Sequence, residues 1–571
     1  MASFDFAKLV NLRDFIPRTC EIFQQGEGKG YGWTSLRKDL IAGLTVGVVA
    51  LPLSMAFSIS AGGSPAQGLY TAILAGFCIS LLGGSKYQIG GPTGAFVVII
   101  FGIIARHGMA GLVTATILAG IILIIMGLTG IGRFIKFIPY PVTTGFTTGI
   151  ALLIFSQQIK DFFGLHPEAA SPEFLGMWEG YFRVITTVEP GTLAFGLGTL
   201  AVILLVRRFA PRFPGAVAGV AAATIACYLF TLFMGNPPIE TIGTRFGGIP
   251  RTLSLPKLPD LSWQSFRELL RDSFAIAILA AIESLLSAVV ADGMTGDRHN
   301  ANMELVAQGV GNIAAGIFGG IPATGAIART ATNIKAGAVS PVAGIIHALV
   351  LVLFILILAP LASAIPLASL SAVLIVVSWD MSNLGRFFRI LIMSPKSDAL
   401  VLLTTFVLTV MVDLTFAVEV GVVLAAFLFL RRMVEVADIK PGAKGLGTEL
   451  VYGSRGSGSP APEHAKNIEV YEITGPFFFG VADTLQHTLR GVAKKPHAFV
   501  LRMADVPAVD STGITALESF LAQCRRGKIR LILCEIREQP RKALEKAGLI
   551  AELGVENIKD TLQAALVRAE E

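Results

Sequence analysis

Apolar segments separated by short polar loops occupy most of this chain. They lie at about residues 39–60, 66–83, 90–105, 110–128, 138–158, 190–207 and 214–235, and then at 272–292, 303–318, 324–334, 341–363, 365–379, 397–413 and 415–431. A helix needs about 20 residues to cross the hydrocarbon core of a bilayer, and several of these segments are shorter. The pattern predicts an α-helical membrane domain with fourteen transmembrane segments, in which the third segment of each seven is short.

Each short third segment follows a stretch that breaks helices. The first stretch reads Gly-Gly-Pro-Thr-Gly-Ala-Phe at 90–96, and the second reads Gly-Gly-Ile-Pro-Ala-Thr-Gly-Ala-Ile at 319–327. Glycine and proline both disfavour a continuous helix. Paired interruptions at matching places in two halves are a sequence signature of a transporter's binding site. We therefore predict two seven-helix repeats, at about 39–235 and 272–432, with a substrate site where their breaks meet.

The basic residues in the loops indicate how the two repeats are oriented. Seven is odd, so tandem repeats of seven spans must have opposite orientations in the membrane. With the N-terminus inside, the cytoplasmic loops contain Lys86, Arg133 and Arg207, whereas the outside loops after spans 1, 9, 11 and 13 contain no lysine or arginine. Arg106 and Lys160 are exceptions to this bias, which normally marks cytoplasmic loops. The charges predict a 7+7 inverted repeat with both termini in the cytoplasm.

Composition supports the membrane assignment and limits the function. The chain is 53% hydrophobic and 15% charged, whereas ordinary soluble domains carry about 25% charged residues. Its net charge is +6, and the basic residues lie in loops, where the membrane topology accounts for them. We therefore do not take this charge as a sign of nucleic-acid binding and expect no nucleic-acid partner. The histidines and cysteines lack metal-ligand spacing. We expect neither an enzyme nor a bound metal or cofactor.

Residues outside 39–432 differ in composition from the membrane domain. Residues 1–38 form a polar arm, and residues 433–465 have the glycine, serine and proline content of a linker. From 466 to 571 the pattern predicts a small α/β domain with an open sheet covered by helices. The expected strands are Ile468–Ile473, Ala498–Leu501 and Ile529–Leu533, and the expected helices are Gly480–Leu489, Thr512–Cys524, Glu538–Ala547 and Asn557–Val567.

One turn in this α/β domain resembles a known family. Residues 506–514 read Val-Pro-Ala-Val-Asp-Ser-Thr-Gly-Ile and resemble the Asp-Ser-x-Gly turn of the STAS domain. Asp510 is a good N-cap for the helix that follows. The resemblance implies that Ser511 matches the serine phosphorylated in anti-sigma-factor antagonists, which makes Ser511 a candidate regulatory site.

A STAS domain attached to fourteen spans is similar to the sulfate-permease (SulP) family of anion transporters, and within it to the bacterial branch that transports C4-dicarboxylates. The stretches that carry the resemblance are Leu51–Phe57, Gly90–Phe96, Ala281–Ser287, Asp292–Gly296 and Ala326–Thr330. The family resemblance implies a core domain and a gate domain, each built from both repeats. It also implies half-length third and tenth helices that meet near the middle of the bilayer, and a homodimer in the inner membrane.

The two breaks have the chemistry of an anion site. A helix N-terminus carries unpaired N–H groups and about half a positive charge. Arg329 adds a permanent charge, and an ionisable residue at membrane depth is a functional candidate by default. We predict that substrate contacts come from Phe57, Thr93, Gly94, Ala95, Phe96, Thr324, Gly325, Ala326, Ala328, Arg329 and Thr330.

Glu283 is the main carboxylate within the apolar eighth span. Burial in apolar surroundings raises the pKa of a carboxyl group, whereas a nearby cation lowers it. A carboxyl group under both influences can gain or lose a proton. Glu283 could therefore carry a coupling proton, or hold sodium together with Ser287 one turn away, or serve as a structural hydrogen-bonding group. Arg329 could pair with Glu283 instead of contacting substrate, and the two roles are compatible.

The sequence therefore predicts a secondary active transporter of small anions, with sulfate, C4-dicarboxylates such as succinate or fumarate, and bicarbonate as candidate substrates. Proton symport and an elevator-type movement of the core domain are the preferred mechanism. Sodium coupling, anion exchange, an anion channel and a nucleobase permease of the same architecture remain alternatives. A membrane-anchored STAS signalling protein, with a cytoplasmic partner, is the alternative without transport.

Overall fold

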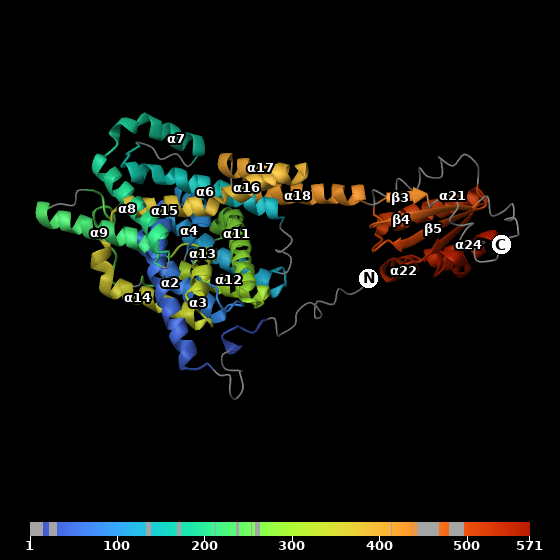
Figure 1. Ribbon diagram of the computed structural model, residues 1–571, viewed down its shortest axis with the longest axis horizontal. Helices are drawn as coiled ribbons and strands as arrows, with labels where there is room; N and C mark the ends of the chain where they lie inside the picture. Colours follow the sequence, from blue (N-terminus) through green and yellow to red (C-terminus); the bar gives the residue numbers. More distant parts are fainter. Residues whose placement is uncertain are drawn as a thin grey trace. The chain divides into compact units, whose positions relative to one another are not determined.

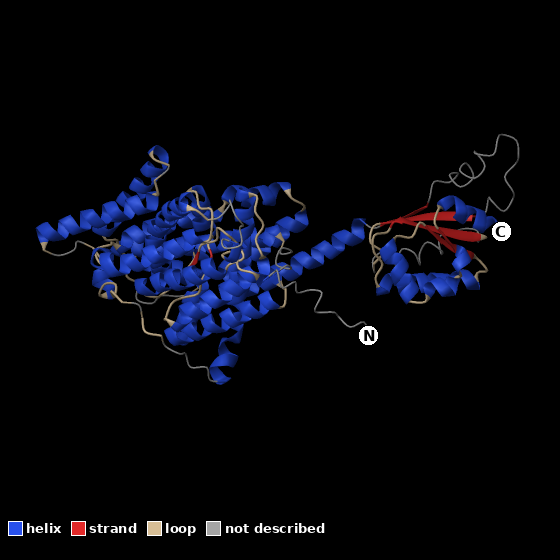
Figure 2. Ribbon diagram, turned by 90° about the horizontal axis from the view of Figure 1, so that it is seen from below, coloured by secondary structure: helices blue, strands red, loops and turns tan. Residues whose placement is uncertain are grey.

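The chain folds into two units. The computed structural model describes residues 15–21, 31–132, 139–167, 173–211, 213–235, 239–252, 254–256, 263–412, 414–436, 438–441, 468–478 and 496–571. Met1–Val423 form a helical unit, and Leu424–Glu571 form a unit built around a sheet (Figures 1 and 2). The two units are described separately below.

The helical unit contains the fourteen membrane spans of a 7+7 inverted repeat. The first seven are α2 (Trp33–Ser60), α3 (Pro65–Leu82), the two parts of α4 (Val97–Leu128), α6 (Tyr140–Phe163), α8 (Pro190–Phe209) and α9 (Gly215–Met234). The second seven are α11 (Trp263–Thr295), α12 (Ala301–Ile317), α13 (Ile327–Lys335), α14 (Val342–Ala362), α15 (Leu367–Ser382), α17 (Lys396–Met411) and α18 (Leu414–Val436), the last of which continues past the boundary between the units. The shorter helices that the structure describes in this unit are η3 (Gly94–Phe96), α7 (Phe174–Arg183), η4 (Ile185–Thr187), α10 (Ile242–Phe246) and α16 (Leu384–Met393).

Gly108 divides α4 into the third and fourth spans. Its φ of 66° and ψ of −174° are not helical, and glycine adopts positive φ without the steric cost that a Cβ imposes. The third span is therefore a half-length helix, like α13 in the second repeat. Among the described helices, eight are by length and composition alone able to cross a membrane.

The spans pack as two helical groups, each drawn from both repeats. Helices α2, α3, α4, α11, α12, α13 and α14 contact one another and form the core domain. Helices α6, α8, α9, α15 and α17 form the gate domain, and η3 and α2 contact the gate helix α6. This arrangement matches the predicted core and gate.

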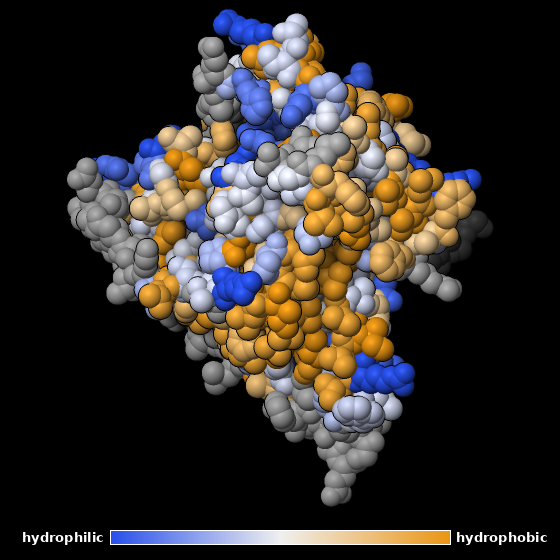
Figure 3. Space-filling view, turned by 90° about the vertical axis from the view of Figure 1, so that its left-hand side faces the viewer, coloured by the Kyte–Doolittle hydropathy of each residue, from blue (hydrophilic) through white to orange (hydrophobic). Residues whose placement is uncertain are grey.

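Small residues allow the core helices to approach closely. A Cβ on Gly120 of α4 would lie 2.6 Å from the Gly309 carbonyl oxygen of α12, and a Cβ on Gly309 would lie 2.5 Å from the Gly120 carbonyl oxygen. Helices in a bilayer associate through such close packing because lipid tails are as apolar as the side chains. The outer surface is apolar instead: Leu232, Phe233 and Ile357 are exposed by 67%, 83% and 67%. Figure 3 shows a broad apolar area on the face toward the α9 end of Figure 1, as expected of a lipid-facing surface.

A buried carboxylate holds the α3–β1 turn against α12. Glu304 is 0% exposed and accepts four hydrogen bonds: from the Gly84 and Ser85 amides at 3.0 and 3.2 Å, and from the Gln88 and Gln308 side chains at 3.0 and 2.9 Å. Four donors and no acceptor face the carboxylate in these bonds. A side chain that brings its own donor to this position would leave buried groups unsatisfied.

Glu304→Gln is therefore expected to lower the free energy of unfolding by about 3 kcal/mol, because an amide NH2 would face N–H donors in a buried site. The measurement is the thermal unfolding midpoint of the purified full-length protein. Glu179→Gln is the matched control: Glu179 pairs with Arg183 on the surface, with the two side chains 64% and 76% exposed, and such pairs contribute below about 1 kcal/mol. Equal midpoints for the two variants would contradict the role of Glu304.

The second unit is an α/β domain with a five-stranded sheet in the order β3-β4-β5-β6-β7. Its strands are β3 (Asp438–Pro441), β4 (Ile468–Thr474), β5 (Ala498–Asp505), β6 (Arg530–Cys534) and β7 (Ile558–Lys559), and β3 alone among these pairs antiparallel. Its helices are α21 (Ser511–Arg526), α22 (Glu538–Lys546), α23 (Leu549–Leu553) and α24 (Leu562–Glu570), with the short η6 (Val555–Asn557). Separate apolar clusters cover the two faces of the sheet, one including Phe520 and the other including Ala565.

Several predicted boundaries were wrong. Span 1 begins at Trp33 and span 8 at Trp263, because helices continue beyond the apolar core of a span. Residues 433–436 and 438–441, predicted as linker, are the end of α18 and strand β3, since pairing with β4 stabilises a strand of weak propensity. The last helix begins at Leu562 rather than Asn557, because Ile558 and Lys559 pair with β6. The predicted helix Gly480–Leu489 and most of the linker lie outside the described residues.

Candidate substrate site

The two glycine- and proline-rich breaks meet inside the core domain. Strand β1 (Gly90–Gly91) pairs antiparallel with β2 (Thr324–Gly325), with Gly90 opposite Gly325 and Gly91 opposite Thr324. Figure 2 shows these two short strands within the helical unit. The Ala326 amide also donates to the Ile89 carbonyl at 2.9 Å. Extended backbone at membrane depth is tolerated only where protein or a water-filled cavity supplies hydrogen-bond partners for its N–H and C=O groups. Here the backbone of each break supplies partners for the other.

A helix begins directly after each break. Thr93 is the N-cap of η3, which continues into α4, and Ala326 is the N-cap of α13; the structure shows no side-chain cap at either of these two positions. The first N–H groups of a helix have no intrahelical partner and carry partial positive charge. Ala328 in the first turn of α13 is exposed and Ile327 is 40% exposed. The N-terminus of α13 can therefore be reached by a small ligand.

Arg329 places a fixed positive charge between the two breaks. It is 3% exposed, and its Nη2 donates to the Pro92 carbonyl oxygen of the other repeat. Its Nη1 lies against Gly91, so closely that a Cβ at Gly91 would overlap it, and has no hydrogen-bond partner among the described residues. A buried guanidinium with an unused donor is suited to bind an anion, directly or through water.

Glu283 of α11 lies beside this arrangement. It is half-buried, and its carboxylate accepts a hydrogen bond of 2.9 Å from the Thr93 hydroxyl. The ion pairs within 4.0 Å among the described residues do not include one between Glu283 and Arg329. Ser287, one turn further along α11, donates to Thr330 at 3.1 Å, and the Thr330 hydroxyl accepts the Ile89 amide. These bonds connect α11 to both breaks.

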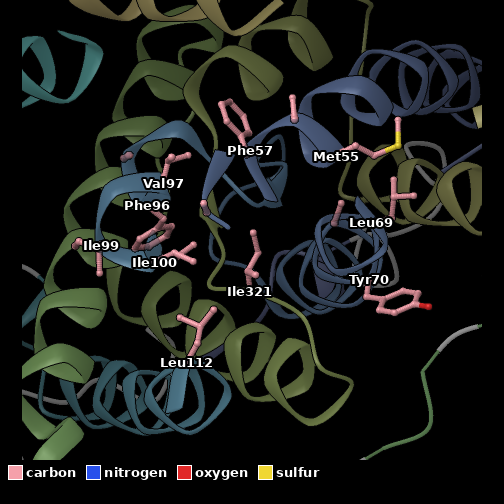
Figure 4. Packing of buried hydrophobic residues seen from close by; sticks show 14 of the residues in the cluster. Met55, Phe57, Leu69, Tyr70, Phe96, Val97, Ile99, Ile100, Leu112 and Ile321 are labelled. Carbon is pink, nitrogen blue, oxygen red and sulfur yellow. The ribbon is translucent and has the colours of Figure 1, made fainter. Parts of the chain in front are cut away.

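Five other predicted contact residues are buried in the packing around the two breaks. The Thr324 hydroxyl donates to the Ala280 carbonyl at 3.0 Å, so its proton is already engaged. Phe57 and Phe96 are 5% and 0% exposed and belong to one apolar cluster with Ile321 (Figure 4). Ala95 and Ala326 are buried as well, exposed by 4% and 7%.

Two glycines at the breaks fit closely against their neighbours. A Cβ on Gly94 would lie 2.9 Å from Ile154 of α6 and 3.2 Å from Met381 of α15, so Gly94 is where the core meets the gate. Gly325 fits against the Gln88 side chain without room for a Cβ.

The edge of the core next to the N-terminal arm is held by ion pairs. Lys86 lies 3.1 Å from Asp297 and 3.2 Å from Glu21 of the N-terminal arm. Partial burial alone would raise the pKa of the Asp297 carboxyl, but the Arg298 amide and the Lys86 ammonium together hold that pKa below its usual range. Asp292 contacts His299 at 2.7 Å. Both aspartates are engaged in local structure at this edge.

Two buried polar groups of the core, Glu304 and His347, are not among the residues predicted from the sequence. Glu304 stands at the start of span 9, where a carboxylate looks like an interfacial residue. His347 of α14 is 0% exposed, and neither of its ring nitrogens has a partner among the described residues. For His347 the available signal was a single ionisable residue within an apolar span.

In the Leu424–Glu571 unit, Asp510 caps α21 as predicted: its carboxylate accepts the Gly513 amide at 2.8 Å. Ser511 is exposed at the first position of this helix.

The fold and the site define a multi-pass membrane transporter of the inverted-repeat type whose two breaks enclose a fixed cation. The chain belongs to the sulfate permease family, which matches residues 36–405, and it carries a STAS domain, which matches residues 459–565. Family and relatives are anion transporters and not enzymes.

Full-length relatives support this assignment. YvdB of Bacillus subtilis (strain 168), whose name assigns it to sulfate transport, is 41% identical over 94% of this chain and 98% of its own length. The bicarbonate transporter BicA of Picosynechococcus sp. is 31% identical over 90% of this chain and 91% of its own length. The overall structure of SLC26A9 superposes with a TM-score of 0.80 at 18% identity, covering 98% of this chain and 93% of that one, which shows the same fold.

Proposed function

We propose that this protein is a secondary active transporter that binds a small anion between the N-termini of η3–α4 and α13. The observation that carries the proposal is Arg329, a buried guanidinium that donates to Pro92 of the opposite repeat and whose Nη1 has no hydrogen-bond partner among the residues that the structure describes. Two helix N-termini and one arginine supply donors and positive charge without a separate cation for each substrate charge. The substrate classes that fit are sulfate, bicarbonate and C4-dicarboxylates such as succinate.

We further propose that proton symport drives uptake, with Glu283 as the group that carries the proton. The support is its position: it is half-buried, and it accepts a hydrogen bond from the hydroxyl of Thr93, the N-cap residue within one break. Protonation at this point would change the charge next to the anion site. Sodium coupling through Glu283 and Ser287 is the alternative that the same position allows.

The remaining parts of the proposal concern the whole protein. The core domain moves as an elevator against the gate, and the contact of Gly94 with Ile154 and Met381 lies at the sliding surface. The protein is a homodimer of a bacterial inner membrane with both termini in the cytoplasm. The STAS domain regulates transport, and the exposed Ser511 is its candidate phosphorylation site.

Uptake of labelled sulfate, succinate and bicarbonate into proteoliposomes tests the function. We expect saturable uptake of at least one anion, stimulated by an inward proton gradient and competed by its own unlabelled form. Uracil is the competitor that tests for a nucleobase permease, and it should not compete. Absence of any solute flux would favour a membrane-anchored signalling protein, and conductance far above carrier turnover would favour a channel.

A further inference from the structure

His347 of α14 is a buried histidine whose ring has no hydrogen-bond partner in the described part of the chain. The ring is 0% exposed, and neither Nδ1 nor Nε2 makes a hydrogen bond to any described residue. A buried polar group without a partner destabilises the folded protein, because it has lost its hydrogen bonds to water. Buried polar groups of native proteins nearly always have a partner in the protein or in an ordered water. The surroundings of the ring therefore indicate what satisfies it.

The ring lies on a face of α3 that is lined by small residues. A Cβ on Gly76 would lie 3.6 Å from His347 Nδ1 and 3.2 Å from the Gly90 carbonyl oxygen. One turn earlier on the same face of α3 lies Ala72, whose Cα is 3.4 Å from the position of a Cβ on Gly91. Nη1 of Arg329 lies 2.4 Å from that same position. Both unpartnered groups thus face α3, at Ala72 and at Gly76.

The spacing suits one bridging water. Residues four apart on a helix are separated by about 6 Å along its axis, and two N–H···O or O–H···N hydrogen bonds end to end span about the same length. A water there would accept from Nη1 of Arg329 and donate to Nδ1 of His347 and to the Gly90 carbonyl oxygen. Three bonds are the usual number for a buried water.

We propose that His347 is a positioning residue of the anion site, which holds the Nη1 group of Arg329 through one buried water. Nη2 of Arg329 is fixed by Pro92, and this second link fixes the plane of the guanidinium relative to the two helix N-termini. The proposal rests on the function proposed above, because it concerns how the same arginine is held. His347 acts through Arg329 and does not touch the anion.

Three variants of the full-length protein test the role through uptake kinetics. His347→Leu removes the acceptor, and we expect KM to rise about 10-fold with kcat within about twofold, because a buried hydrogen bond to a charged group is lost. His347→Gln keeps an acceptor oxygen and should restore KM to within about threefold of wild type. Gly76→Ala places a methyl group against the ring and the Gly90 carbonyl, and should raise KM as His347→Leu does.

Two further measurements separate positioning from a general structural role. In an Arg329→Lys background, which lacks the second amino group, His347→Leu should change KM by less than about twofold. A density map at about 2 Å resolution should show a peak within hydrogen-bond distance of both Nη1 and Nδ1. An unchanged KM in His347→Leu, an equal loss in His347→Gln, or a map without this peak would overturn the proposal. The density map tests the water bridge between Arg329 and His347 independently of transport, so it applies even if wild-type protein takes up none of the three anions.

Discussion

Arg329→Ala is expected to weaken anion binding at least about 100-fold while the protein is expressed and inserted normally. The guanidinium is 3% exposed and donates to Pro92 of the opposite repeat. In such a poorly solvated site, charge-assisted hydrogen bonds are stronger than neutral ones, and a charge acts over a low effective dielectric constant. A 100-fold loss corresponds to about 2.7 kcal/mol. The measurement is the KM for labelled anion in proteoliposomes, or Kd from equilibrium binding.

Arg329→Lys is the matched variant for this experiment. Lysine keeps the positive charge but lacks the planar guanidinium group with its several donors. We therefore expect an anion affinity between that of wild type and that of Arg329→Ala. Thermal unfolding of all three proteins shows whether the loss is one of binding or of folding. A folded Arg329→Ala protein with unchanged affinity would refute a substrate role and leave Arg329 as a structural link between the two breaks.

Glu283→Gln is expected to abolish accumulation of the anion against its gradient, and with it the dependence of uptake on a proton gradient. Glutamine keeps an oxygen that can accept the 2.9 Å hydrogen bond from Thr93, so the local geometry should persist while the exchangeable proton is lost. Exchange of labelled for unlabelled anion should continue, since exchange needs no net proton movement. The measurement compares uphill uptake with counterflow at several imposed pH gradients.

Asp272→Asn is the control, because Asp272 is on the same helix α11 but pairs with Arg106 at 3.0 Å. This variant should keep the pH-gradient dependence of wild type. Ser287→Ala combined with an imposed sodium gradient tests the alternative coupling ion. If Glu283→Gln leaves both uptake and its pH-gradient dependence intact, proton coupling through this residue is excluded.

The sequence predicted the helical architecture well because transmembrane segments are encoded locally. Consecutive apolar residues must form helices in a bilayer, where an unpaired backbone group costs several kcal/mol. The glycine and proline stretches at 90–96 and 319–327 are local signals of the same kind, and they are the breaks that pair as β1 and β2. Where local propensity is weak the prediction was wrong, as for β3, which exists because β4 lies beside it.

Candidate residues could be named from the sequence, but their partners could not. Thr93 and Thr324 are equivalent in the two breaks as sequence, yet one hydroxyl bonds to Glu283 and the other to the Ala280 carbonyl. Both bonds are to α11, which belongs to the second repeat only. The inverted repeat therefore does not make the two breaks chemically equivalent.

The sequence alone determined that this chain spans a membrane, that it repeats, and that a buried arginine follows one of two matching breaks. Only the tertiary structure decided that Pro92 holds this arginine from 237 residues away and that Thr93 reaches Glu283 across 190 residues. It also decided that His347 faces Gly76 beside the Gly90–Gly91 strand. The physical reason is that hydrophobic burial depends on the composition of each segment, whereas a hydrogen bond depends on positions that are fixed only when distant helices pack together.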